Sequence, residues 1–136
     1  SRRQRQMCKE TGLTLEWMYR ELETNRPIPL FEIHGTEDKT SMWNGDPNNE
    51  GAGEYIAVPI AVNYWAIQNR CTHEITDTIA SIDSLSNHTI ISHKYVNGIN
   101  RNEVWLYEIK GGKHSWGEKD LNTSEHIWLF FSKFVR

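Results

Sequence analysis

Residues 29–38 read PLFEIHGTED, and this stretch decides the fold. Its first half is apolar and predicts a buried strand, which stops at a glycine-containing turn and delivers the acidic pair Glu37 and Asp38. The pattern recurs at residues 103–117, EVWLYEIKGGKHSWG, where an apolar strand runs into two glycines and then His114. In open α/β sheets, functional groups lie just past the carboxyl ends of the strands, and both Asp38 and His114 are expected there.

Hydrophobic periodicity and breaker residues divide the rest of the chain into elements. Helices are predicted at residues 11–25, 58–71 and 122–134, and strands at residues 28–33, 73–80, 88–96 and 103–109. The two middle strands are predicted to form a hairpin or a neighbouring pair, and the long polar segment 34–54 is predicted to be a functional loop. We expect the first and last strands to be parallel neighbours because a helix connects them.

These elements predict an α/β fold with parallel strands, flanking helices and a β-hairpin. Two parallel strands do not make a stable sheet by themselves, so the sheet is expected to be incomplete, the end of a larger fold. The last helix should present a broad apolar face to the sheet. Its members are Ile127, Trp128, Phe130, Phe131 and Phe134.

The composition of the chain limits the kinds of partner that it can have. Its 136 residues are enough for one domain with a real core, and the net charge of −3 argues against nucleic acid as the main partner. No apolar stretch reaches the ~18 residues of a membrane helix, so no membrane partner is expected. The sequence has neither a signal peptide nor an initiator Met, so we expect it to be processed or excised from a longer protein. Cys8 and Cys71 permit one disulfide and require none.

Asp38 and His114 are the candidate catalytic residues. Taken singly, each has an ordinary structural role, since an Asp after a strand often caps a loop and a lone His is often a hydrogen-bonded structural residue. Taken together at two parallel strand ends, they are an acid that orients a ring and a histidine that serves as general base. Trp43 and Trp116 flank the two loops and are candidates for lining an acyl or aromatic substrate pocket. His34 is expected to make hydrogen bonds in its turn.

We expect no metal ion and no cofactor. The remaining histidines, at positions 73, 88, 93 and 126, show no metal-ligand spacing, and the acidic, Asn-rich loop after Trp43 lacks the ligand order of a calcium-binding EF-hand.

Three segments carry a resemblance to a known family. They are PIPLFEIHGTEDKTSMWNGD (27–46), AVNYWAIQNRC (61–71) and VWLYEIKGGKHSWGEKDLNTSEHIWLFFSKF (104–134). Together they resemble the C-terminal half of the polyhydroxybutyrate-depolymerase-like and feruloyl-esterase-like serine esterases, which are secreted α/β-hydrolases. The resemblance covers residues 26–136 of what we treat as a single, partial domain, and it leaves residues 1–25 poorly matched. It implies that Asp38 is the triad acid and His114 the triad histidine.

The family resemblance implies a carboxylic-ester hydrolase that cleaves a feruloyl or other polysaccharide-linked ester, or a short polyester, in a secreted or periplasmic setting. The chain departs from the family in lacking the G-x-S-x-G nucleophile elbow and the oxyanion-hole loop, and in having Lys113 before the histidine. The usual disulfide partner of the cysteine matching Cys71 is also missing from residues 94–104. We therefore expect the chain alone to be inactive and to associate with itself or with a missing N-terminal half. The alternative is a non-catalytic carbohydrate- or partner-binding remnant of the hydrolase scaffold.

Overall fold

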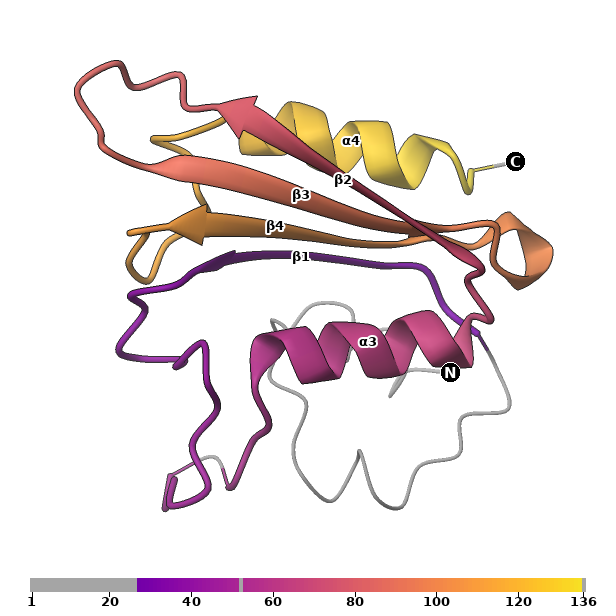
Figure 1. Ribbon diagram of the computed structural model, residues 1–136, viewed down its shortest axis with the longest axis horizontal. Helices are drawn as coiled ribbons and strands as arrows, with labels where there is room; N and C mark the ends of the chain where they lie inside the picture. The colour runs from indigo at the N-terminus through magenta and orange to yellow at the C-terminus, as the bar shows by residue number, and fades with distance from the viewer. Residues whose placement is uncertain (1–26, 52, 136) are drawn as a thin grey trace.

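The computed structural model describes residues 27–51 and 53–135. The helix predicted at residues 11–25 lies outside this region. So does Cys8, one of the two cysteines of the possible Cys8–Cys71 disulfide. Within it, the elements follow in the order β1 (Leu30–Gly35), α3 (Val58–Gln68), β2 (His73–Ala80), β3 (Thr89–Val96), the 3-10 turn η1 (Ile99–Arg101), β4 (Val104–Lys110) and α4 (Thr123–Ser132). Figure 1 shows the sheet as a middle layer, with α3 on one face and α4 on the other.

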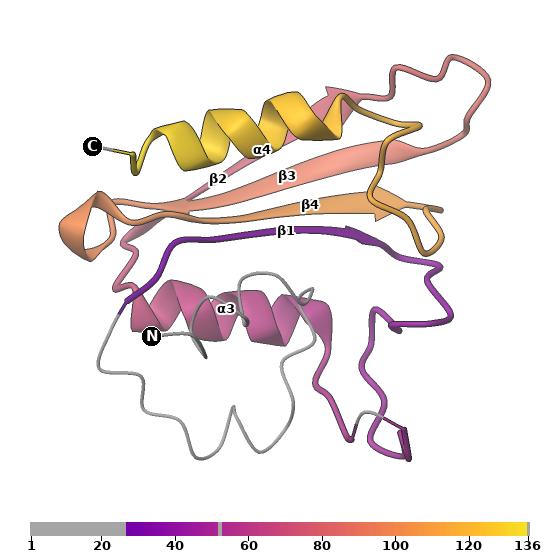
Figure 2. The same cartoon turned by 180° about the vertical axis from the view of Figure 1, so that it is seen from behind.

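The four strands form one mixed sheet in the order β1-β4-β3-β2. β1 and β4 are parallel, with Leu30 opposite Val104 and Gly35 opposite Ile109, whereas β3 runs antiparallel to both β4 and β2. The parallel pair and the hairpin predicted from the sequence are thus confirmed, as is the α/β class. The view from behind in Figure 2 shows the carboxyl ends of β1 and β4 lying at the same end of the sheet.

β4 is the central strand of the described sheet, because it pairs with β1 on one side and β3 on the other. β1 has no strand on its outer side within residues 27–51 and 53–135. An apolar parallel strand at a sheet edge leaves half of its backbone N–H and C=O groups facing away from its one neighbour. That the sheet is the incomplete end of a larger fold stays a prediction.

Helix α3 packs on β1 and β4 through a stripe of small and aromatic side chains. Pro59 occupies the first turn, where a missing N–H costs nothing. Trp65 and its buried neighbours one and two turns away pack on Val104 and Leu106 of β4. The helix ends at Gln68, three residues earlier than predicted, because Arg70 has a left-handed backbone with φ of 53°.

Helix α4 covers the opposite face of the sheet through one side chain above all. Asn122 caps its first turn by accepting the N–H of Glu125. Phe130 is fully buried against Phe31 and Trp105, whose ring centroids lie 5.4 and 5.1 Å away. The prediction of a broad buried face is wrong in part, since Trp128 is 68% exposed and Phe131 42%. A straight helix over a twisted sheet buries a narrow stripe, and no other described layer covers its outer side.

Cys71 is half-buried and is a free thiol among the described residues, and its sulfur lies 4.0 Å from the carbonyl oxygen of Asn102. None of the described helices is both long and apolar enough to cross a membrane.

Candidate active site

Hydrogen bonds from backbone N–H groups join the loops that follow β1 and β4. The N–H of Thr36 donates to the carbonyl of Ile109 at 3.0 Å, and the N–H of Glu37 donates to the carbonyl of Gly112 at 2.9 Å. The N–H of Gly111 returns to the hydroxyl oxygen of Thr36 at 3.0 Å. Two segments more than 70 residues apart in the sequence are therefore held side by side at the carboxyl ends of the parallel strands.

Asp38 and His114 meet where these loops touch. Oδ2 of Asp38 lies 2.8 Å from Nδ1 of His114, which is hydrogen-bond distance. The second carboxylate oxygen, Oδ1, accepts the backbone N–H groups of Thr40 and Ser41, each at 2.8 Å. All three bonds use acceptor positions of an ionised carboxylate, so the Asp38 side chain is held with Oδ2 directed at the ring.

The protonation states of the pair follow from these contacts. Burial by itself would raise the pKa of Asp38, but the hydrogen bonds from Ser41, His114 and Thr40 outweigh it and hold that pKa below its ordinary value. An ionised Asp38 can only accept, so Nδ1 of His114 carries the proton and Nε2 is left as the basic nitrogen. The His114 side chain is 58% exposed, whereas that of Asp38 is 4% exposed. The ring thus has a buried acid on one side and an accessible base on the other.

The described chain offers His114 no nucleophile. No serine hydroxyl in the described part of the chain forms a hydrogen bond with Nε2 of His114. The adjacent hydroxyl, that of Ser115, instead accepts the N–H of Gly117 at 3.1 Å. Glu37, the acid nearest to Asp38, is exposed and is not the partner of the ring.

The two tryptophans predicted to line a pocket occupy different environments. Trp116, two residues after His114, is 63% exposed. Trp43 is half-buried and packs against the core between α3 and the sheet, with its ring centroid 6.0 Å from that of His34. Contact of either ring with a substrate stays a prediction, and the exposed indole of Trp116 is the better placed of the two.

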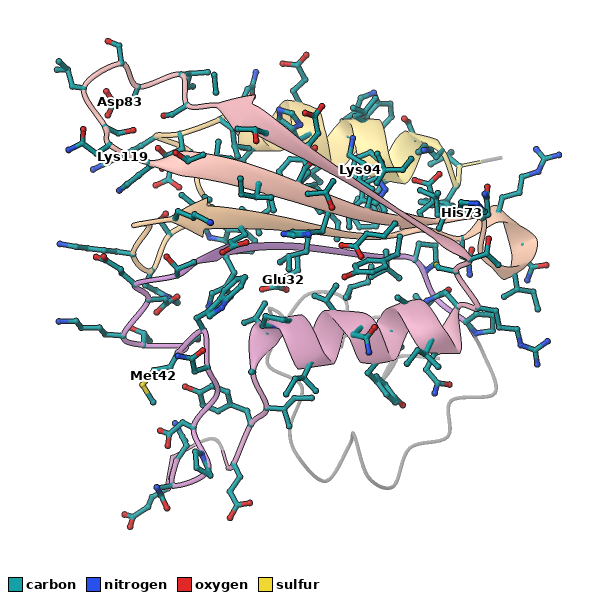
Figure 3. The ribbon with its side chains drawn as sticks, in the orientation of Figure 1. Glu32, Met42, His73, Asp83, Lys94 and Lys119 are labelled. Atoms are coloured by element: carbon teal, nitrogen blue, oxygen red, sulfur yellow. The ribbon has the colours of Figure 1, made fainter. Side chains whose placement is uncertain are left out.

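A second histidine–carboxylate cluster, which the sequence did not reveal, lies at the same end of the sheet. The buried Asp120 lies 3.0 Å from Nδ1 of His88 through each carboxylate oxygen and accepts the hydroxyls of Ser81 and Ser86 at 2.9 and 3.1 Å. Burial by itself would raise the pKa of Asp120, but these three partners lower it below its ordinary value. In Figure 3, the labels Asp83 and Lys119 mark the hairpin loop and the β4–α4 loop that this cluster ties together.

Both serines of this second cluster point at the acid rather than at the ring. Ser81 and Ser86 donate to Oδ1 of Asp120, and their oxygens lie 3.1 Å apart. A serine activated by His88 would have to face its Nε2 instead. The cluster therefore fixes the loop and is not arranged as a catalytic triad.

A third histidine, His93 of β3, has a carboxylate at each ring nitrogen. Glu74 lies 3.2 Å from Nδ1 and Glu108 lies 3.3 Å from Nε2. Among the residues that the structure describes, no group of three or more histidine, cysteine, aspartate or glutamate side chains has the arrangement of a metal site.

Comparison with known proteins adds no relative to this picture. The sequence matches no protein-family model, and a search of curated proteins also finds no match.

Proposed function

We propose that this chain carries the acid and the general base of a serine carboxylic-ester hydrolase with an α/β-hydrolase sheet. The single observation that supports this most is the Asp38–His114 contact of 2.8 Å at the adjoining ends of two parallel strands. The acid, Asp38, is buried and the base, His114, is exposed, which is the arrangement that a proton-transferring pair requires.

In this proposal the nucleophile is a serine on polypeptide that adjoins the open edge of β1. A strand added parallel to β1 would end at the same edge of the sheet as Asp38 and His114. Its serine would lose its proton to Nε2 of His114 as it attacks the ester carbonyl. Asp38 would stabilise the imidazolium that forms, and the same proton would then pass to the departing alcohol.

The ester that fits the exposed surroundings of His114 is one presented on a polymer, such as an acyl or feruloyl group on a polysaccharide or a short polyester. Trp116 is the proposed platform for its sugar or aromatic part, because an exposed indole stacks well on flat apolar faces. The proposal requires no metal and no cofactor, and it places the complete enzyme outside the cytoplasm by family resemblance.

The decisive experiment compares this chain with a longer one. The coding sequence upstream of Ser1 is read, the extended protein is expressed, and both are assayed with p-nitrophenyl acetate and a fluorophosphonate probe. We expect hydrolysis and a serine adduct from the extended protein and neither from residues 1–136 alone. An upstream region without G-x-S-x-G, or turnover by the short chain, would contradict the proposal, and the first result would favour a carbohydrate- or partner-binding remnant instead.

A further inference from the structure

His34 is the penultimate residue of β1, four positions before Asp38. It is 8% exposed, and both of its ring nitrogens have partners. Nδ1 is 3.0 Å from a carboxylate oxygen of Glu32, and Nε2 is 2.7 Å from the backbone carbonyl oxygen of Ser41. Figure 3 shows Glu32 on the side of the sheet that faces α3.

The Ser41 carbonyl can only accept, and an ionised Glu32 carboxylate can only accept as well, so beside ionised Glu32 the ring donates from both nitrogens. A carbonyl oxygen carries no proton, and an ionised carboxylate carries none either. A histidine that donates twice is an imidazolium. Burial by itself would lower the pKa of His34, but the hydrogen bonds to Glu32 and Ser41 outweigh it and raise that pKa above its ordinary value of 6.5.

The charges around His34 are consistent with a cation at this position. Asp38 lies 3.7 Å from Nε2, and Glu108 is the residue opposite His34 in the β1–β4 register. Helix α3, which covers this face of the sheet, carries no acidic or basic side chain. Two carboxylates therefore lie close to the ring nitrogens, Glu32 at 3.0 Å and Asp38 at 3.7 Å.

The contact with Ser41 links His34 to the catalytic pair. The carbonyl of Ser41 is held by His34, and the N–H of the same residue is held by Oδ1 of Asp38. Fixing the Ser41 backbone keeps Oδ1 occupied and leaves Oδ2 as the oxygen that faces His114.

We propose that His34 is a positioning residue, which acts as an imidazolium clamped between Glu32 and Ser41 to hold Asp38 in the orientation that bonds His114. The reaction that this orientation serves rests on the proposed function, whereas the clamp itself is a property of the described chain. Glu32 keeps the ring charged, and Ser41 transmits its position to the carboxylate.

The test uses the 136-residue chain, labelled with nitrogen-15 at histidine, and three variants. Glu32→Gln combined with His34→Leu removes the donor to Ser41 while leaving no unpaired charge in the two buried positions. His34→Gln retains a side-chain N–H that can reach the Ser41 carbonyl. His93→Gln is the matched control, because His93 also lies between two acceptors on this sheet face but does not contact the Asp38 loop.

Two readouts report on the clamp without any catalytic assay. They are the nuclear magnetic resonance signal of the His114 Nδ1–H proton and the hydrogen-exchange rates of the Thr40 and Ser41 amides. In the double variant we expect the His114 signal to disappear and the two amides to exchange at least about tenfold faster. In His34→Gln and His93→Gln we expect the signal to persist and exchange to stay within about threefold of wild type.

Retention of the His114 signal and of amide protection in the double variant would overturn the proposal, as would their loss in His34→Gln. A further measurement needs no variant: the nitrogen-15 shifts of His34 at pH 6 should be those of a doubly protonated ring, and a neutral ring would also overturn it. None of these readouts involves an ester, so failure of the clamp and failure of the proposed hydrolase are separate results.

Discussion

Replacement of Gly35 by alanine tests whether close approach of the two loops creates the site. A Cβ atom at position 35 would lie 2.2 Å from the carbonyl oxygen of Gly112 and 2.7 Å from that of Lys113, whereas real Cβ contacts are essentially never under 3.0 Å. The atoms in the way are backbone, so no side chain can rotate to make room. The loop after β4 would have to move away from β1 by roughly 1 Å.

This movement acts directly on the Asp38–His114 pair, because the Gly112 carbonyl is the acceptor of the Glu37 N–H at 2.9 Å. A shift of about 1 Å would lengthen the Asp38–His114 contact from 2.8 Å to beyond the hydrogen-bond range. Overpacking of this kind costs about 1–3 kcal/mol of unfolding free energy. In a domain of this size each kcal/mol corresponds to a fall of roughly 3–6 °C in Tm.

The assay is thermal unfolding by circular dichroism together with the His114 Nδ1–H signal. For Gly35→Ala we expect a Tm lower by about 5–15 °C and loss of the signal. Gly51→Ala is the control, since a Cβ there meets only the side-chain oxygen of Asn49 at 3.6 Å, and its Tm should stay within about 2 °C of wild type. A Gly35→Ala chain with wild-type Tm and an intact signal would refute the steric reasoning.

Three further predictions concern the charged groups and the sheet edge. If the extended protein is the proposed esterase, Asp38→Asn should lower its kcat by about 10⁴-fold with little change in Tm, because an amide directed at Nδ1 favours the wrong tautomer of His114. Wild-type kcat would remove Asp38 from the proposed mechanism. Stability of the 136-residue chain should be greatest between about pH 4 and 6.5. The pKa values of Asp38 and Asp120 are lowered in the folded chain, so their contributions to stability are lost as the pH falls through those pKa values. The pKa of His34 is raised in the folded chain, so its contribution is lost as the pH rises through that pKa. Tm measured across pH checks this, and Asp120→Asn should flatten the acid side, whereas an unchanged acid limb would contradict the assignment. We also expect the short chain to self-associate through β1, and a clean monomer at high concentration by analytical ultracentrifugation would argue against this.

The parallel pair and its loops could be predicted from the sequence because each depends on a local pattern. An apolar run that stops at glycine identifies β1 and β4 separately, and the rule that functional groups follow parallel strands places Asp38 beside His114. No spatial information beyond the strand order was needed, since the register then sets the loops side by side.

The Asp120 cluster could not be predicted in this way. Its serines, its histidine and its acid come from two loops, His88 and Asp120 are 32 positions apart, and none of them forms a motif with its sequence neighbours. The exposed side of α4 was missed for a related reason. Periodicity shows that Trp128 and Phe131 are apolar, but only the partner surface determines whether they are covered.

What separates His114 from the other paired histidines is the state of its second ring nitrogen. His34 and His93 have acceptors at both ring nitrogens, so each has a structural role. His88 has an acid at Nδ1, but it packs against Gly111, and the neighbouring serines bind its acid instead of its ring. Only His114, among these four, combines a buried acid at Nδ1 with an exposed side chain at the carboxyl ends of parallel strands. A base must have a nitrogen that is both basic and reachable, and this requirement, rather than the presence of a histidine–carboxylate pair, is what singles out Asp38 and His114.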